Sequence, residues 1–484
     1  MPQPSPFVEV AEFERRISRP KSPEAGVADF FGGKAIWAVR VPARLDVMGG
    51  IADYSGAHVC EATLGRGILV AVQPREDRLL RIRTLSLGPG SLPVETSIPL
   101  DYFGSRGKSA SYDEVRALYR GNPLASWAAY AGGSLFALAK EESLWLRSGF
   151  DILLLSAVPM NAGIASSAAV EMGTLCALNA CLGLGLDAAR LARIGQVAEN
   201  RVVGAPCGIM DQIAVTSGRS GQLTHILCRP GRVVGTVEIP RGTGFAGINS
   251  MVRHSVAAAP YGDVRIGAFM GKRILNALRA EKGLPPVKHL TEIPGAELEA
   301  MGRRLPEALT GAEFLARHRT HGDPATAIRP AATYRIRGPV RHAVLENERV
   351  LRFIDALRAA ARGDEAGCIA AGKEMYGSHG SYRDECRLSV PEVDALVDAV
   401  RRRGAKKGLY GAKITGGGAG GTVAVFGRLD ALKRHIPEIA AEHARRRGTE
   451  PDVFWGTSAG AMEFGARRYE PRAGGWSCRQ AQER

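Results

Sequence analysis

A run of glycines near the carboxyl end constrains the fold of this 484-residue chain more than any other feature. Residues 411–421 read GAKITGGGAGG, so only Ala419 interrupts the final glycines. Glycine loses more conformational entropy on folding than other residues, and a run of it weakens a helix or strand interior. The flanking β-branched residues Ile414 and Val423 favour a tight loop over a flexible linker. We therefore expect this loop to pack against a ligand site.

A second segment, PMNAGIASSAA (159–169), follows a predicted buried strand (151–157) and opens a predicted helix. Gly163 would let the backbone approach a ligand, and the helix N-terminus offers free N–H groups to a phosphate. Ser166 and Ser167 would add hydroxyl groups for a phosphate or for Mg²⁺. The segment is not a Walker A loop, because no Gly-Lys-Ser/Thr follows the glycine. A serine-capped helix without a ligand explains this segment alone about equally well.

Two further segments place charged residues beside glycines. Residues 207–212 read CGIMDQ, and residues 41–56 read VPARLDVMGGIADYSG. Taken singly, Asp211 fits an ordinary helix cap, and the charged residues of the earlier segment fit surface ion pairs.

Taken together, these segments resemble the galactokinase branch of the GHMP kinase family. PMNAGIASSAA, CGIMDQ and GAKITGGGAGG match its three motifs in order, and the resemblance extends from about Ala35 to Gly465. It also passes through the stretches 250–265, 341–350 and 378–384. It implies an α+β fold of two lobes, with the active site in the cleft between them. The expected divisions are an N-terminal extension (1–35), an N-terminal lobe (36–235), a C-terminal lobe (236–470) and a tail (471–484).

The resemblance further implies an ATP-dependent sugar kinase and a role for each matched residue. Asp211 would be the catalytic acidic residue, as a general base or as an orienting group, and Arg44 its cationic partner. Ser167 and Glu199 would bind Mg²⁺. The expected ATP-binding residues are Pro159, Gly163, Ile164, Ser166, Ser167, Ala168, Gly416, Gly417 and Gly418. The expected sugar-binding residues are Asp46, Gly50, Ile51, Asp53, Gly208 and Tyr261.

One departure bears on the sugar. Galactokinases read Gly-Glu-His-Thr-Asp-Tyr where residues 49–54 read GGIADY, and DVMGGIADYSG is similar to members that phosphorylate L-arabinose. L-Arabinopyranose matches the D-galactopyranose ring but lacks the exocyclic hydroxymethyl group. Losing Glu and His would leave a buried hexose hydroxyl unpaired, so we expect L-arabinose to give L-arabinose 1-phosphate. The alternatives are that Gly50 and Ile51 only repack the turn, that galactose or another sugar is the substrate, and that the chain is a non-catalytic sugar and ATP sensor.

Charge and composition set the expected partners. The formal net charge of +15 fits either a solvated arginine-rich surface or attraction for anionic ligands such as nucleotides. No zinc-finger or RNP-type pattern occurs, so we expect no nucleic-acid partner. Polar residues interrupt the most apolar stretch, and the first residues lack the apolar run of a secretory signal. We therefore expect no membrane partner. The eight cysteines include no Cys-x-x-Cys pair, which favours small core residues in a reducing compartment over a zinc site, so we expect a cytoplasmic location. Nothing in the sequence predicts an oligomeric state.

Local patterns predict several elements outside these segments. Strands are expected at 35–41, 68–73, 79–85 and 422–426. Ser389 and Glu392 have capping-box spacing, and apolar residues at helical intervals follow as far as Gly404, which predicts a helix. Residues 275–330 lack clear periodicity and predict loops and short helices. The first 35 residues and the segment after about Pro471 are expected to be irregular.

Overall fold

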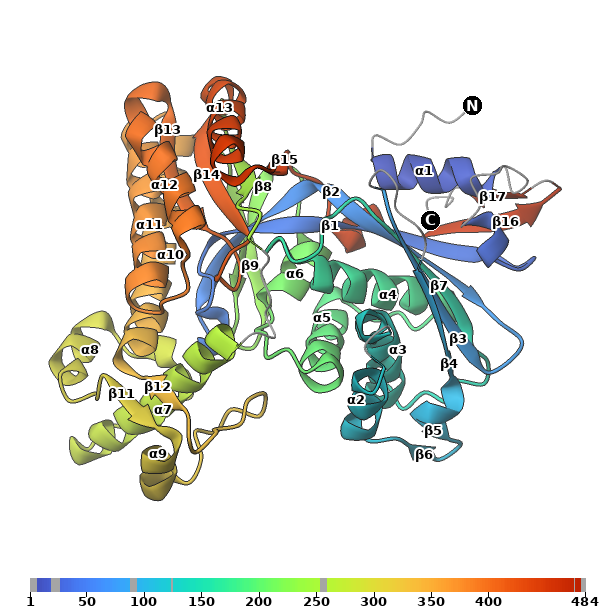
Figure 1. The fold of residues 1–484 in the computed structure, drawn as a ribbon, viewed down its shortest axis with the longest axis horizontal. Coiled ribbons are helices and arrows are strands. Elements are labelled where there is room, and N and C mark those ends of the chain that lie inside the picture. Colours follow the sequence, from blue (N-terminus) through green and yellow to red (C-terminus); the bar gives the residue numbers. More distant parts are fainter. Residues whose placement is uncertain are drawn as a thin grey trace.

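The computed structural model describes residues 7–18, 27–87, 94–122, 125–252, 259–473 and 475–479. Its elements form two lobes side by side, each built on its own sheet (Figure 1). Helices and largely antiparallel sheets together confirm the expected α+β class. Parts of the predicted extension and tail, and residues 253–258 of the stretch 250–265, lie outside the described residues.

The N-terminal lobe contains a nine-stranded sheet. Its main order is β17-β16-β1-β2-β7-β3-β4, with β8 pairing to β2 and β9 to β8. Strands β3 and β7 run parallel, and the other pairs of this sheet are antiparallel. The strands are β1 (Ile36–Met48), β2 (His58–Pro74), β3 (Leu79–Ser86), β4 (Val94–Pro99), β7 (Phe150–Ser156), β8 (Gln222–Leu227), β9 (Arg232–Glu238), β16 (Arg467–Arg472) and β17 (Gly475–Arg479). The strands predicted at 35–41, 68–73, 79–85 and 151–157 correspond to β1, β2, β3 and β7, although β1 and β2 are much longer than expected. The fifth predicted strand, 422–426, belongs to the C-terminal lobe.

Helices of the N-terminal lobe cover one face of this sheet (Figure 1). They are α2 (Tyr112–Arg120), α3 (Ala129–Glu141), α4 (Ser166–Leu182), α5 (Ala188–Ala198) and α6 (Met210–Ser217), with a short hairpin of β5 (Gly104–Ser105) and β6 (Lys108–Ser109). The predicted helix from Ser166 is confirmed as α4, which packs on β1 and β2. A Cβ atom at Gly173 would lie 2.4 Å from Val70, so this glycine lets α4 approach the sheet closely.

The C-terminal lobe is built on an antiparallel sheet of order β13-β14-β10-β15. Its strands are β10 (Thr243–Asn249), β13 (Leu409–Ile414), β14 (Thr422–Arg428) and β15 (Val453–Trp455). Its helices are α7 (Ala259–Glu281), α8 (Gly295–Gly302), α9 (Gly311–His318), α10 (Arg337–Ala361), α11 (Glu365–Asp384), α12 (Pro391–Arg403) and α13 (Leu429–Arg447), with a small hairpin of β11 (Ala308–Thr310) and β12 (Thr333–Arg335). The expected short elements of 275–330 are thus present, after the end of the long helix α7. The short helix α14 (Ala461–Phe464) returns the chain to the N-terminal lobe, where it contacts α6 and β1.

Helix α12 confirms the predicted helix but begins differently. Val393, Leu396 and Val400 are buried, as their spacing requires. The predicted N-cap, Ser389, lies one residue too early: the helix begins at Pro391 with Val390 as its N-cap. The Ser389 hydroxyl instead donates to the Asp394 carboxylate at 2.6 Å. Proline is favoured at the first helical position because it has no N–H to leave unpaired, and it sets the start here.

The chain termini correct the expectation of irregular ends. Residues of the predicted extension form α1 (Val8–Ile17), and residues of the predicted tail form β17, which joins β16 at the edge of the large sheet. Val10, Phe13 and Ile17 lie on one face of α1 and are buried with Tyr469 of β16. These residues recur at helical spacing in the sequence, but only three apolar positions in a short segment rich in Glu and Arg are a weak helical signal. Figure 1 shows α1, β16 and β17 together at one end of the molecule.

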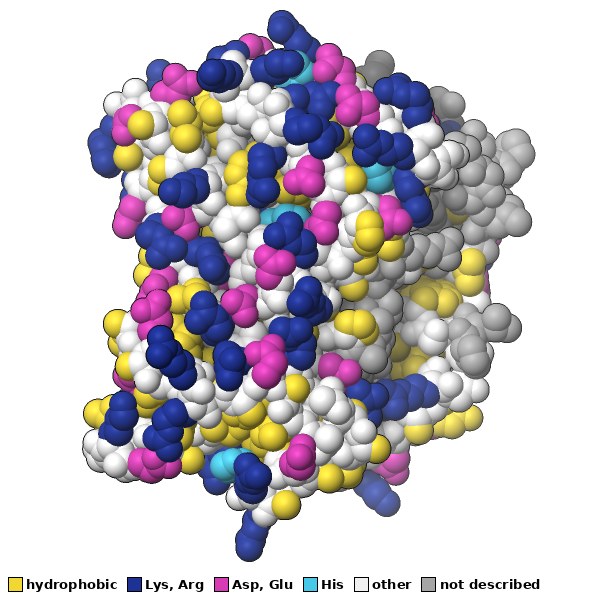
Figure 2. Space-filling model, turned by 60° about the vertical axis from the view of Figure 1, so that its left-hand side comes forward, with side chains coloured by type: hydrophobic (Ala, Val, Ile, Leu, Met, Phe, Trp, Pro, Cys, Tyr) yellow, Lys and Arg dark blue, Asp and Glu magenta, His cyan; other side chains and the backbone are white. Residues whose placement is uncertain are grey.

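The surface explains much of the positive charge without a ligand. On the face in Figure 2, over the C-terminal lobe, lysine and arginine side chains are scattered among aspartate and glutamate rather than gathered in one stripe. This distribution favours the solvated-surface explanation on that face. Within the described residues, no helix is both long enough and apolar enough to cross a membrane.

Candidate active site

The centre of the candidate site is an ion pair between the two residues predicted to be catalytic. Arg44 lies on β1 and is almost fully buried, whereas the Asp211 side chain, in the first turn of α6, is 23% exposed. The Arg44 guanidinium donates from Nη2 to both Asp211 oxygens at 2.6 Å and from Nε to Oδ1 at 2.9 Å. Its Nη1 atom donates to the Gly163 carbonyl at 2.8 Å. Arg44 therefore ties the candidate catalytic carboxylate to the predicted phosphate loop.

Burial opposes the charge of Arg44, but its acidic neighbours outweigh that effect. Desolvation alone would lower the pKa of Arg44, whereas Asp211 and Glu61 raise the pKa overall. Glu61 of β2 lies 3.3 Å from Arg44 Nε and was not identified from the sequence. Burial raises the pKa of Glu61 well above its usual range. A protonated Glu61 would leave Asp211 as the main anionic partner of Arg44.

The predicted phosphate loop joins β7 to α4 in an irregular conformation. Asn161 and Ala165 both have φ near +60°, which is uncommon outside glycine, and Gly163 has φ +72°. Ala165 is the N-cap of α4 and has no side-chain group with which to cap the first N–H groups. The start of this 17-residue helix is thus suited to an anion, with Ser166 and Ser167 half-buried in its first turn. Pro159, Ile164 and Ala168 lie in or beside this loop.

The glycine run is the loop of the β13–β14 hairpin and packs directly on the phosphate loop. A Cβ atom at Gly416 would lie 2.9 Å from the Gly163 carbonyl, and one at Gly421 would lie 3.0 Å from the Ala162 carbonyl. The Thr422 hydroxyl donates to the Ala162 carbonyl at 2.8 Å. The expectation of a tight loop is confirmed, and the linker alternative is wrong.

Positive φ angles in this loop fall on both neighbours of Gly417. Gly416 and Gly418 have φ of +73° and +79°, whereas Gly417 is not among the residues with positive φ. At Gly416 a side chain would therefore cause both backbone strain and a collision with the phosphate loop.

One predicted magnesium ligand, Glu199, belongs to a pair of buried carboxyl groups with Glu171. The Gln212 amide donates from Nε2 to Glu199 at 2.8 Å and to Glu171 at 3.0 Å. Burial raises the pKa of both glutamates, and a hydrogen bond from Ser167 partly offsets this for Glu199. Oxygen donors from one hydroxyl and one carboxylate, completed by phosphate oxygens and water, suit Mg²⁺. Ser167 and Glu199 therefore fit the ion, although the described residues contain no group of three His, Cys, Asp or Glu side chains arranged around a metal.

Three of the predicted sugar-binding residues lie near one another, and the charge of Asp211 acts on one of them, Asp53. A Cβ atom at Gly208 would lie 1.7 Å from the Asp53 carboxylate, so only glycine lets these two residues meet. Burial, followed by the negative charge of Asp211, raises the pKa of Asp53 to about 6. The Oδ1 atom of Asp53 is buried and has no hydrogen-bond partner among the described residues. Tyr261 of α7 packs edge-to-face on Tyr54, with ring centroids 6.1 Å apart.

The other three predicted sugar-binding residues face the protein interior. The Asp46 carboxylate is fully buried and pairs with Lys413 at 2.8 Å. Ile51 is 1% exposed and belongs to an apolar cluster with Tyr382 and Leu388. A Cβ atom at Gly50 would lie 1.9 Å from the Tyr382 hydroxyl and 2.0 Å from Asp46 Oδ2. The direct sugar contacts expected of Asp46, Gly50 and Ile51 are not supported by this geometry, because tertiary partners distant in the sequence surround them.

Arg265 of α7 is a further residue that the sequence did not single out. It forms a bidentate pair with Asp323, at 2.7 and 2.8 Å, and donates to the carbonyl of Cys207 at 2.9 Å. Its guanidinium lies 5.2 Å from the centroid of the Tyr54 ring. Arg265 thereby holds the segment that precedes Gly208 against the C-terminal lobe.

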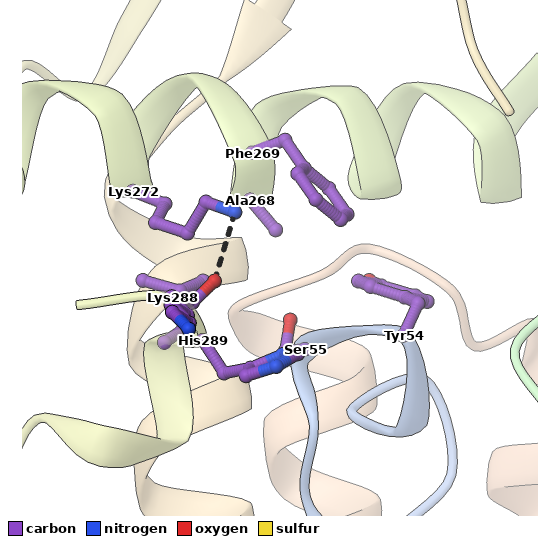
Figure 3. A pocket seen from close by; sticks show the side chains of 8 residues that line it. Tyr54, Ser55, Ala268, Phe269, Lys272, Lys288 and His289 are labelled. Carbon is purple, nitrogen blue, oxygen red and sulfur yellow. Dashed lines mark hydrogen bonds between the residues drawn. The ribbon is translucent and has the colours of Figure 1, made fainter. Parts of the chain in front are cut away.

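Tyr54 also lines a small pocket that is separate from the predicted site residues (Figure 3). It lies between the turn after Asp53, helix α7 and the segment before Leu290, and the Lys272 ammonium group donates to the Lys288 carbonyl across it at 3.1 Å. None of the predicted site residues lines this pocket. The candidate active site is thus defined by its charged residues and loops rather than by this pocket.

Comparison with known proteins agrees with this arrangement of lobes and loops. The description "GHMP kinases N terminal domain" matches residues 129–219, "GHMP kinases C terminal" matches 365–444, and "Galactokinase galactose-binding signature" matches 28–74. The structure resembles that of the Lactococcus lactis galactokinase complexed with galactose, with a TM-score of 0.65, 22% identity and coverage of 91% of this chain and 97% of that one.

Sequence relatives point the same way. A galactokinase of Streptomyces coelicolor is 32% identical over 89% of this chain and 94% of its own length. An L-arabinokinase of Arabidopsis thaliana is 34% identical over 95% of this chain, although the chain spans about half (49%) of that relative's length. The fold and the motifs are those of a small-molecule kinase. The chain belongs to the galactokinase branch of the GHMP kinase family and is a sugar kinase.

Proposed function

We propose that the protein transfers the γ-phosphoryl group of ATP to the anomeric hydroxyl of a sugar, and that this sugar is L-arabinose. The observation that carries the proposal is the Arg44–Asp211 pair, held where the phosphate loop meets the glycine loop and beside the buried Asp53. Phosphoryl transfer depends mostly on positioning and on electrostatic stabilisation of the transferred group, and these residues supply both.

In the proposed reaction, the anomeric oxygen forms a bond to the γ-phosphorus while the bond to the bridging oxygen of ADP breaks. Asp211 orients the hydroxyl group, and its proton passes to Asp211 or to solvent. Arg44 donates to both carboxylate oxygens of Asp211 and so fixes the orientation of this side chain. Mg²⁺, bound by Ser167, Glu199 and phosphate oxygens, would neutralise the developing charge. The glycine loop and the N-terminus of α4 would hold the phosphates.

The identity of the sugar rests on the turn at residues 49–54. Galactokinases have Glu and His where Gly50 and Ile51 stand, and the L-arabinokinase relative aligns over nearly the whole chain. The missing polar side chains would leave a hexose hydroxymethyl group without hydrogen-bond partners. D-Galactose is the second candidate, because the galactose-binding signature covers this same turn and galactokinases match almost all of the chain.

The structure changes how the sugar assignment is best tested. Restoring the pair by Gly50→Glu and Ile51→His would drive a Cβ atom into the Tyr382 hydroxyl and the Asp46 carboxylate. Loss of activity in that variant would thus report a collision rather than specificity. The clean experiment compares kcat/KM of the unmodified protein for L-arabinose, D-galactose and a panel of other sugars, with ATP. L-Arabinose preference supports the proposal, galactose preference replaces the substrate, and binding of sugar and ATP without turnover supports the sensor alternative.

A further inference from the structure

A group of buried residues lies against the start of the glycine loop. None of their side chains is placed to contact a substrate directly. We call Asp46, Tyr382, Lys413 and Gly416 the Asp46 cluster. Asp46 Oδ2 accepts from Lys413 Nζ at 2.8 Å and from the Gly416 N–H at 3.1 Å, and the Tyr382 hydroxyl lies 3.3 Å away. Both members of the Asp46–Lys413 pair are 0% exposed. A buried ion pair is weak evidence for stability, because the cost of desolvation offsets the attraction between the charges. We therefore assign the Asp46–Lys413 pair to the positioning of the groups around it.

The Asp46 cluster joins the two lobes at the junction of both candidate substrate sites. Asp46 belongs to β1 of the N-terminal lobe, whereas Lys413 lies on β13 and Tyr382 on α11 of the C-terminal lobe. The Lys413 ammonium also donates to the Asp46 carbonyl at 3.2 Å, and the Asp46 N–H donates to the Thr415 hydroxyl at 2.6 Å. These contacts fix the end of β13, and with it the start of the glycine loop, relative to β1.

On one side, the Asp46 cluster determines where the glycine loop lies. The Tyr382 hydroxyl donates to the Gly416 carbonyl at 2.9 Å, while the Gly416 N–H is held by Asp46. A Cβ atom at Gly416 would also lie 2.9 Å from the Gly163 carbonyl and 3.4 Å from Arg44 Nη2. Gly416 therefore lies between the other members of the Asp46 cluster and the Arg44–Asp211 pair.

On the other side, the Asp46 cluster touches the turn that precedes Asp53. The Cβ position of Gly50 is occupied by the Tyr382 hydroxyl and the Asp46 carboxylate. The carbonyl of Gly50 is hydrogen-bonded to His342 Nε2 at 3.0 Å, and His342 packs edge-to-face on the Tyr382 ring. If sugar binding moves this turn, the Tyr382 hydroxyl must move with it. Because that hydroxyl is bonded to the Gly416 carbonyl, Gly416 would move as well.

We propose that the Asp46 cluster couples the sugar-site turn to the glycine loop, so that sugar and nucleotide each increase the affinity for the other. Asp46, Tyr382 and Lys413 are then positioning residues rather than sugar ligands. The inference rests on the proposed function, because it assumes that both substrates bind at the sites described above. Coupling of this kind is reciprocal and typically changes affinity by about 5- to 150-fold.

The test measures that coupling directly by calorimetry. The Kd for L-arabinose, and for D-galactose, is measured with and without a saturating non-hydrolysable ATP analogue. We expect the analogue to tighten sugar binding at least about fivefold in the unmodified protein. Tyr382→Phe removes one buried hydroxyl group and should reduce this factor about fivefold, or to one, with a smaller change in the Kd of either ligand alone.

Tyr376→Phe is the matched control, because Tyr376 lies on the same helix and its hydroxyl has no hydrogen-bond partner among the described residues. It should leave the coupling factor unchanged. Two results overturn the inference and leave the proposed function standing: binding of both ligands without coupling, and full coupling in Tyr382→Phe. Failure to bind any nucleotide overturns both.

Hydrogen exchange of the unmodified protein supplies a second measurement that needs no variant. L-Arabinose or D-galactose alone, whichever binds, should slow exchange in a peptide that contains residues 415–421, although the proposed sugar site does not include that loop. Unchanged exchange in this peptide under saturating sugar would contradict the coupling.

Discussion

At the scale of single residues, two carboxylates of the site lie in contrasting surroundings. Asp211 is partly exposed and holds the Arg44 guanidinium through both oxygens, whereas Asp53 is buried and one of its oxygens has no partner in the part of the chain that the structure describes. The first carboxylate is held in a charge-assisted pair, whereas burial raises the pKa of the second. The two residues therefore respond differently to substitution and to pH.

Replacing Asp211 by asparagine should lower turnover by about 100-fold or more, the usual effect of removing a positioned acid–base group. Asparagine keeps the size of the side chain but removes the charge that faces Arg44 and the sugar hydroxyl. Steady-state kinetics and calorimetry with an ATP analogue would measure the loss of turnover and the retention of nucleotide binding. Asp77→Asn, in the surface pair Arg75–Asp77, is the control for losing an arginine–aspartate contact. A folded Asp211→Asn protein with normal turnover would refute the assignment.

Asp53→Asn should stabilise the protein at pH 7.5. The pKa of Asp53 rises from 3.8 to about 6 on folding, so the folded state holds the proton more tightly. Stability therefore falls as the pH rises from about 4 to 6, and the ionised form at pH 7.5 costs about 1–3 kcal/mol. Thermal unfolding of both proteins at pH 7.5 and pH 4 measures this effect. The gain should be clear at pH 7.5 and small at pH 4, and a larger gain at pH 4 would show that the sign is wrong.

At the scale of elements, the motif-bearing segments were predictable and their deeper contacts were not. Helix α4 and the β13–β14 loop were predictable from local patterns. A largely apolar run follows Ser166 and Ser167 in α4, and β-branched residues flank the glycine run of the loop. Pairing of Arg44 with Asp211 followed from the family resemblance. The burial of Asp46 could not be foreseen, since its partners Tyr382 and Lys413 come from α11 and β13, more than 300 residues further along the chain.

The glycine loop gives a prediction at this scale. Gly416→Val places a branched side chain at φ +73° and against the Gly163 carbonyl, so the loop must move away from the phosphate site. We expect ATP affinity to weaken by about tenfold or more, with sugar binding in the absence of nucleotide largely kept. Calorimetry with each ligand separately distinguishes the two effects.

Gly107→Ala provides the control for that variant. Gly107 also has positive φ, at +81°, but a Cβ atom there would meet nothing within 4 Å, and it lies in the β5–β6 hairpin. It should bind ATP normally. Unchanged ATP affinity in Gly416→Val would show that the loop does not hold the nucleotide.

At the scale of the whole molecule, described segments near both termini pack on the large sheet: β16 and β17 extend its edge, and α1 lies against it. Helix α1 packs across strands β2 and β7 and beside β17, and its residue Glu9 forms a buried ion pair with Arg40 of β1 at 2.6 Å. Figure 1 shows α1, β16 and β17 together at one end of the large sheet. We therefore assign α1, β16 and β17 to stability rather than to catalysis.

Phe13→Ala tests that assignment. Phe13 is fully buried and packs edge-to-face on Tyr469 with centroids 5.3 Å apart, so its truncation should cost about 3–5 kcal/mol of unfolding free energy. Turnover at a temperature where the protein stays folded should be unchanged. Val8→Ala, at an exposed position of the same helix, should alter neither stability nor activity. Thermal unfolding monitored by circular dichroism measures the difference, and a stable Phe13→Ala protein with reduced turnover would contradict the assignment.

The central claim is that this chain phosphorylates a sugar at its anomeric oxygen through the site around Arg44 and Asp211. Phosphorus and proton NMR of the products formed from ATP and L-arabinose test it most directly. We expect ADP and a sugar phosphate whose phosphorus couples to the anomeric proton, and we expect Asp211→Asn to form this product about 100-fold more slowly. A phosphate on any other carbon, or no phosphorylation of any sugar in the panel, would contradict it.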